Sequence, residues 1–177
     1  MPAYLLLLLA VVSRVVPHPE WLNFTAVGGS LLFFGARRPL RQAWIPVAAL
    51  AATDYYLTAF FYRYPFHVTD YLLTWAWYAA VIVFAHFPLA KKTSAARVAA
   101  GVIVAPTSFF LLTNFAAWLG NPTLYPRSMA GLDMSYIAGL PFYRNDLLST
   151  AAVAGLAFGI PVLARQLAAQ HSRVAGA

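Results

Sequence analysis

Two polar residues interrupt apolar stretches of this sequence, and they are the first candidates for chemistry. Asp54 lies within one such stretch and Asn114 within another. A carboxylate inside an apolar helix costs roughly 2.5–3.5 kcal/mol on membrane-insertion scales, so Asp54 is expected to face a protein interior or a water-filled cavity. There it could contact a ligand or a cation. The alternatives are a structural ion pair with Arg14 or Arg63, or a position near enough to the membrane surface to stay hydrated.

Aromatic and hydrogen-bonding residues gather around these two positions along the chain. Trp and Tyr often form belts at both membrane surfaces, but most of these residues fall on one side of the topology predicted below. We interpret that asymmetry as an outward-facing pocket, in which aromatic rings stack on a ring system and amides and carboxylates bind its edge. Arg127 or a histidine would bind an anionic group. The predicted substrate-binding residues are His18, Asn23, Asp54, Tyr55, His67, Trp75, Asn114, Trp118, Tyr125 and Arg127.

Metal and enzyme chemistry find little support in the residue pattern. His18 and His67 lie beside prolines in separate loops, which is a weak metal signal. The sequence contains no cysteine, which excludes disulfides, thiolate metal sites and cysteine nucleophiles. No phosphate-binding glycine loop and no pair of intramembrane carboxylates is present. An intramembrane enzyme using His18, His67, Asp70 and Arg127 is the least favoured alternative, and we predict no metal or cofactor.

The composition defines the environment in which these residues work. Of the 177 residues, 62% are hydrophobic and 10% are charged, whereas a soluble domain carries about 25% charged residues. We therefore predict one integral membrane domain over residues 1–177, with the lipid bilayer as its surroundings. The net charge of +7 comes from basic residues in short segments between apolar runs, a pattern typical of membrane topology signals and not of nucleic-acid binding.

The apolar runs predict an all-α bundle of six transmembrane helices. Proline, glycine and charged residues separate them into residues 3–16, 23–35, 44–61, 71–87, 98–119 and 147–167. The first run lacks a basic leader and a small-residue cleavage site, so we interpret it as a retained helix. Asn23 is the expected N-cap of the second helix. The first two helices are shorter than the about 20 residues that a full span requires.

Charge sets the expected orientation, because lysine and arginine favour the cytoplasmic side. A cytoplasmic N-terminus places eight of the 12 basic residues on the inner side and all five acidic residues toward the outer side. The inner basic residues are Arg37, Arg38, Arg41, Lys91, Lys92, Arg97, Arg165 and Arg173. We therefore predict a multi-pass protein of the bacterial inner (cytoplasmic) membrane with both termini in the cytoplasm.

Further expectations concern the segment before the sixth helix and the small residues of the bundle. A long outer loop is predicted over residues 120–145, with an interfacial helix between Pro126 and Pro141 that covers the outer mouth. Asn145 and Asp146 would then cap the sixth helix, with ligand binding as a secondary role. Gly28-Gly29 within the second helix predicts close packing or a kink. Small residues four apart predict close helix packing within the bundle, and docking to a partner subunit is the alternative. The spaced pairs are Ala48/Ala52, Ala96/Ala100 and Gly155/Gly159.

Several motifs give the chain a resemblance to an uncharacterised bacterial family described as transport proteins. They are Pro17-His18-Pro19, Asn23-Phe24-Thr25-Ala26-Val27-Gly28, Thr113-Asn114-Phe115-Ala116-Ala117-Trp118-Leu119, Leu124-Tyr125-Pro126-Arg127 and Leu140-Pro141-Phe142-Tyr143-Arg144-Asn145. In architecture that family is similar to the S-components of energy-coupling-factor vitamin transporters. Those are six-helix membrane proteins that bind a vitamin or a metal from the outer side.

The resemblance implies an outer pocket capped by loops and a reorientation of the whole protein in the bilayer. In most such systems a coupling subunit and two ATPases, supplied in trans, drive that step. The chain departs from the pattern in two ways. It has no cysteine, so the cobalt ligation of one cobalamin-specific type does not carry over, and Ala3 and Ala10 are seven apart where an Ala-x-x-x-Ala docking motif is expected.

The combined prediction is a transport or substrate-capture protein that binds a small organic, vitamin-like micronutrient at its outer face. The main alternative is a non-transport scaffold or an accessory subunit of a complex. Such a subunit would lack a ligand-sized cavity and would copurify with a partner.

Overall fold

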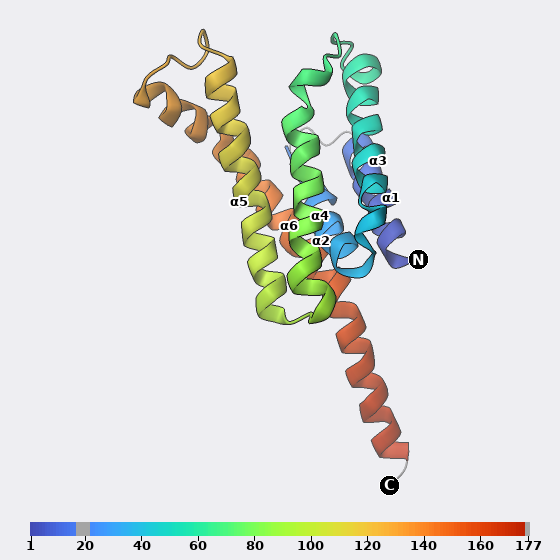
Figure 1. The fold of residues 1–177 in the computed structure, drawn as a ribbon. Helices are drawn as coiled ribbons and strands as arrows, with labels where there is room; N and C mark the ends of the chain where they lie inside the picture. The colour runs from blue at the N-terminus through green and yellow to red at the C-terminus, as the bar shows by residue number, and fades with distance from the viewer. Residues whose placement is uncertain (17–21, 176–177) are drawn as a thin grey trace.

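The computed structural model describes residues 1–16 and 22–175, with side chains up to residue 169, and within those ranges it is helical, without strands (Figure 1). The all-α prediction is therefore confirmed. The six α-helices are α1 (Pro2–Val15), α2 (Val27–Arg37), α3 (Trp44–Tyr56), α4 (Leu72–Lys91), α5 (Ala95–Gly120) and α6 (Met129–Ala175). A π-helix, Leu57–Phe61, extends α3, and 3₁₀ turns occupy Leu40–Gln42 and Val68–Asp70.

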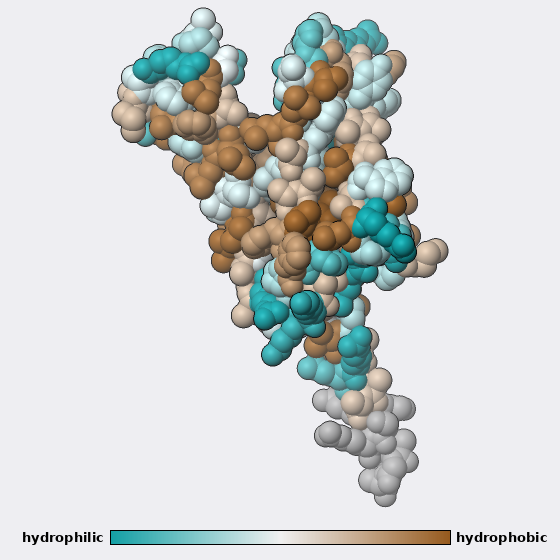
Figure 2. All heavy atoms as spheres, viewed as in Figure 1, coloured by the Kyte–Doolittle hydropathy of each residue, from teal (hydrophilic) through white to brown (hydrophobic). Residues whose placement is uncertain are grey.

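Three of these helices, α4, α5 and α6, are long and apolar enough to cross a membrane. At 1.5 Å per residue, the 14 residues of α1 and the 11 residues of α2 measure only about 21 and 16 Å. Neither reaches the about 30 Å of a bilayer's hydrocarbon core. Hydrophilic side chains gather at the top of the view and again near the lower ends of α4 and α5, and most of the surface between them is apolar (Figure 2). The chain is a helical membrane protein.

Helix α2 forms the centre of the bundle, because every residue from Val27 to Ala36 is buried. It packs against α1, α4 and α6. Adjacent glycines bring α6 against it: a Cβ atom at Gly29 would lie 2.7 Å from Val153 Cβ, and one at Gly28 would overlap the side chain of Thr150. The expected packing role of Gly28-Gly29 is thus confirmed.

The long outer loop predicted between the fifth and sixth helices is wrong. Only residues 121–128 connect α5 to α6, and α6 continues through Pro141 to Ala175 (Figure 1). Proline disfavours a helix interior, but α6 is held against α5 on both sides of Pro141. After the proline, the Tyr143 hydroxyl lies 2.9 Å from Thr107 Oγ1 of α5; the other contacts come before it. Ser135 Oγ donates to the Asn114 carbonyl at 2.7 Å, and Gly139 packs against the Asn114 side chain. These contacts offset the local preference.

Both predicted N-caps are also wrong. Asn145 and Asp146 lie inside α6, because that helix begins before them. Helix α2 starts after Ala26, three residues beyond Asn23. Asn23 instead has a left-handed backbone with φ of 59°, a conformation that asparagine tolerates better than most residues. The chain therefore turns at Asn23 before it enters α2.

The spaced small residues do not pack within the bundle as expected. No atom lies within 4 Å of a Cβ built at Gly155 or Gly159. Both lie on the exposed face of α6, whereas Ala154 and Phe158 beside them are buried against the bundle. Both alanine pairs, Ala48/Ala52 on α3 and Ala96/Ala100 on α5, are likewise exposed. These faces are available to lipid or to another protein.

Candidate functional site

A buried ion pair links α1 to α3. Arg14 Nη2 donates to Asp54 Oδ1, and the two side chains are 18% and 3% exposed. Two residues of α4 complete the arrangement: Trp75 Nε1 donates to Asp54 Oδ2 at 2.9 Å, and Arg14 Nη1 donates to the Tyr78 hydroxyl at 3.0 Å. Of the two partners considered for Asp54, Arg14 is therefore the actual one, and Arg63 lies exposed in the following loop. Both charges are neutralised inside the bundle.

The backbone changes form directly beyond this ion pair. Residues Leu57–Phe61 adopt a π-helix, a form that recurs at functional sites because it redirects side chains within a helix. Thr58 Oγ1 then lies 2.5 Å from the Tyr71 hydroxyl at the start of α4. This contact ties the end of α3 to α4 and places the Tyr71 ring beside Asp54, in the lining of the same cavities.

An open hollow between the helices consists of three adjoining cavities. We call them the α5–α6 cavity, the central cavity and the α1–α3 cavity, with volumes of about 150, 220 and 710 Å³. Asn23 lines all three, so its left-handed turn lies where they meet. Arg14 and Asp54 line the central and α1–α3 cavities, and Asp146 lines the central and α5–α6 cavities.

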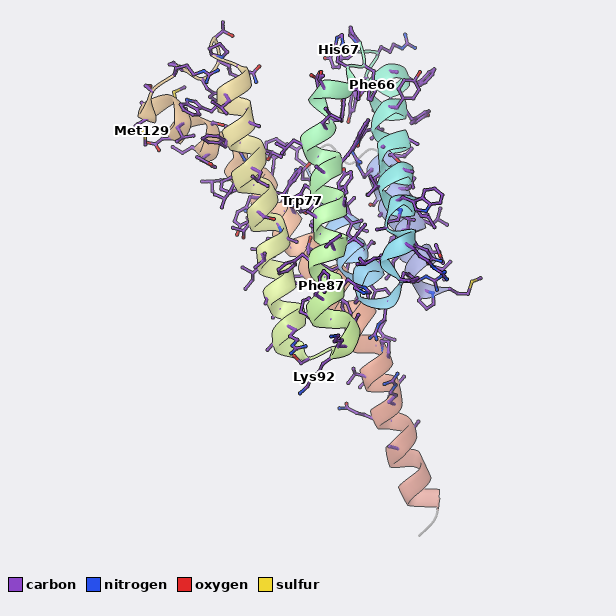
Figure 3. The ribbon with its side chains drawn as sticks, in the orientation of Figure 1. Phe66, His67, Trp77, Phe87, Lys92 and Met129 are labelled. Carbon is purple, nitrogen blue, oxygen red and sulfur yellow. The ribbon has the colours of Figure 1, made fainter. Side chains whose placement is uncertain are left out.

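Aromatic rings form much of the wall of the two smaller cavities. Trp77 lies between α4 and α5 (Figure 3), where its indole donates to Ser108 Oγ at 2.9 Å and its ring centroid is 4.7 Å from that of Phe109. The ring centroid of Phe110, the next residue of α5, lies 4.9 Å from that of Tyr143 on α6. The aromatic lining residues of the two cavities are Tyr71, Trp77, Tyr78, Phe109, Phe110, Phe142 and Tyr143.

One acidic side chain in this lining has no charged partner. Asp146 is 9% exposed and accepts a hydrogen bond from Thr150 Oγ1 at 3.4 Å, one helical turn away. Among the described residues, one ion pair is present, between Arg14 and Asp54, and Asp146 takes no part in it. A buried acid without a basic neighbour is costly unless something else compensates its charge.

Four of the predicted site residues meet in or beside the hollow. Asn23, Asp54 and Asn114 line its cavities. Trp75 holds the carboxylate of Asp54 without lining the cavities described above. The Asn114 side chain donates to the Phe110 carbonyl at 2.8 Å, which fixes the orientation of its amide group.

Two further predicted residues lie away from the hollow. Tyr55 is 49% exposed and makes edge contacts with the rings of Phe60 and Phe66. His67 is exposed at the tip of the segment between α3 and α4 (Figure 3). The prediction for His18 falls outside the residues that the structure describes.

The last three predicted residues form a clasp around the α5–α6 connection. Trp118 Nε1 donates to the Pro126 carbonyl at 3.0 Å, the Arg127 guanidinium lies 5.6 Å from the Trp118 ring centroid, and Arg127 also donates to the Leu119 carbonyl. Tyr125 is partly buried in the same turn. Carbonyl groups at a helix C-terminus lack intrahelical partners, so the clasp stabilises the end of α5.

Sequence reasoning gave Asp146 ligand binding only as a secondary role, because Asp146 was expected to cap the sixth helix. With α6 continuous, Asp146 is an acid inside an apolar helix, and the argument that selected Asp54 applies to it equally. Trp77 and Phe109 were missed because nothing in the sequence distinguishes them from other apolar core residues.

These features define a class: an all-helical membrane protein with a polar and aromatic hollow between its helices. The chain belongs to a family of unknown function (DUF6580), whose family model matches residues 1–172. No curated protein and no solved structure matches the chain.

Proposed function

We propose that this protein captures a small organic molecule from the outer side of the bacterial cytoplasmic membrane, as a substrate-binding or transport protein similar to an S-component. The observation that carries the proposal is the hollow itself. Its three adjoining cavities, of about 150, 220 and 710 Å³, together provide a volume of the order of small-ligand sites, roughly 300–1,000 Å³, and their lining combines aromatic rings with a few fixed polar groups. A scaffold has no need of such a lining.

The proposed topology has six spans and cytoplasmic termini. Basic residues support it, because they gather at the end from which α6 projects: Lys92 lies there in the α4–α5 turn, opposite His67 and Met129 (Figure 3). The start of α1 lies at the same end, since Arg38 Nη2 donates to the Tyr4 hydroxyl at 2.9 Å. The short α1 and α2 would cross a locally thinned bilayer.

Accessibility labelling tests this topology directly, because the chain contains no native cysteine. An impermeant maleimide added to intact cells should label His67→Cys, and it should label Lys92→Cys only after the cells are opened. Labelling of Lys92→Cys in intact cells would overturn the proposed orientation.

The function is tested by native mass spectrometry of the protein gently extracted from its own membrane. We expect a retained small molecule that disappears in Asn114→Ala, because Asn114 lines the α5–α6 cavity. The matched control is Asn121→Ala, an exposed asparagine just beyond the same helix, which should keep the molecule. Loss from both variants, or from neither, would place the ligand elsewhere.

The accessory-subunit alternative draws on one observation, the open space around Gly155 and Gly159. Small residues allow close helix contacts in membranes, so this face suits a neighbouring transmembrane helix. A clean apo mass together with a copurifying protein would favour that alternative. In the transport reading, the same face serves a coupling subunit that acts with ATPases in trans.

A further inference from the structure

The hollow contains a buried carboxyl group, that of Asp146, which forms no ion pair in the described part of the chain. One basic and two acidic side chains line the central cavity: Arg14, Asp54 and Asp146. Arg14 and Asp54 neutralise each other; Arg14 also donates to the Tyr78 hydroxyl, and Asp54 also accepts from Trp75. Asp146 is left with one long hydrogen bond from a neutral hydroxyl. An anionic ligand in this cavity would be repelled by the ionised form of Asp146, and the charge of Arg14 is already balanced by Asp54.

The walls beside Asp146 suit a positive group. Phe109 lines both cavities that Asp146 lines, with Trp77 and Tyr78 on the central side and Phe110 and Tyr143 on the other. Ring faces are negative, and they attract cations most strongly where water is excluded. The described part of the chain holds no group of three or more His, Asp or Glu side chains suited to a metal ion. The aromatic lining favours an organic cation.

We propose that the hollow recognises an organic cation, a quaternary or protonated amine whose charge lies against Asp146 and whose methyl groups or ring lie among the aromatic side chains of α4, α5 and α6. This inference rests on the proposed function and specifies its ligand class. The cation supplies the partner that Asp146 lacks. The Arg14–Asp54 pair shapes one side of the cavity and contributes no net charge.

The test compares three ligands of one shape and different charge: choline, the neutral 3,3-dimethylbutan-1-ol and the anionic 3,3-dimethylbutanoate. Binding is measured by ligand-observed NMR with the full chain in lipid nanodiscs, and empty nanodiscs give the background. We expect choline to bind roughly tenfold or more tightly than the alcohol, and the anion to bind least, because charge pairing and cation–π attraction act on choline alone. Equal or weaker binding of choline relative to the alcohol would overturn the proposal.

Variants assign the effect to named residues. Asp146→Asn should raise the Kd of choline severalfold toward that of the alcohol and leave the alcohol unchanged, whereas Asp133→Asn, at an exposed acid of the same helix, should change neither. If Asp146→Asn fails to fold, Phe110→Leu provides the check, because it removes a ring from the wall and should weaken choline more than the alcohol. Undiminished choline preference in the folded Asp146→Asn protein would refute the assignment.

The outcomes separate this inference from the proposed function. A neutral or anionic molecule found by native mass spectrometry, released by Asn114→Ala and kept by Asp146→Asn, would leave small-molecule capture standing and remove the cationic ligand. A clean apo mass together with no binding of any of the three ligands would remove both.

Discussion

Removing either member of the Arg14–Asp54 pair should destabilise the protein, and removing both should recover much of that loss. The variants are Arg14→Gln, Asp54→Asn and the double substitution. Asp54 is 3% exposed and Arg14 18%, so each single substitution leaves one charge buried without its partner. In the double variant two neutral amides face each other and can still bind Tyr78 and Trp75.

The magnitude follows from burial. Leaving one charge of a buried ion pair without its partner costs about 3–5 kcal/mol, while replacing the whole pair is much less damaging. Arg14 retains some solvent exposure, so we expect about 3 kcal/mol for each single variant. The double variant should lose about 2 kcal/mol, and the double-mutant cycle should therefore give a coupling energy of about 4 kcal/mol, somewhat above the usual range for residues in contact.

The assay is reversible unfolding by SDS in mixed micelles, which gives the free energy of unfolding of each variant. Arg63→Gln is the matched control, since this exposed arginine follows Asp54 in sequence and lies outside the ion pair. It should change the free energy by less than about 0.5 kcal/mol. Additive losses in the double variant would show that the two side chains stabilise the bundle independently, and the reasoning from buried charge would fail.

Two further predictions concern packing and the α5–α6 clasp. Gly28→Ala should destabilise the protein by about 1–3 kcal/mol because its methyl group would overlap Thr150. The methyl group of Gly155→Ala would enter open space, so this variant should stabilise α6 by up to about 1 kcal/mol. SDS unfolding measures both variants, and equal effects would contradict the packing argument. Arg127→Gln should speed limited proteolysis within residues 121–128, because it removes the contacts to the Leu119 carbonyl and the Trp118 ring. An unchanged cleavage rate would show that the clasp does not hold the turn.

Much of the fold could be predicted from hydropathy and helix breakers. The predicted 44–61 segment coincides with α3 and its π-helical extension, and 98–119 lies inside α5. The failure came at Pro141, where local preference and tertiary contact oppose each other. Ser135 and Gly139 pack against Asn114 on α5, and that contact joins residues more than 20 positions apart, so no local pattern could show it.

The site was partly predictable for a similar reason. Asp54 was selected because a charge in an apolar helix must have a partner, and the structure supplies one in Arg14. Trp118 and Arg127 have residue types that suit a ligand, but they satisfy each other and nearby carbonyl groups. Composition and spacing cannot distinguish a side chain that is free to bind a ligand from one that already has a partner within its own turn.

The complete burial of α2 has a consequence for how the protein is made. The ribosome produces α2 early, but α4 and α6, which cover it, follow much later in the chain. In the proposed topology a helix of about 16 Å is too short for an independent span, so α2 would enter the membrane paired with α1. Its Gly28-Gly29 face then stays uncovered until the segment around Thr150 has been synthesised. The core would therefore be completed only when α6 has been made, and a nascent chain stopped before α6 would leave this face of α2 without its cover.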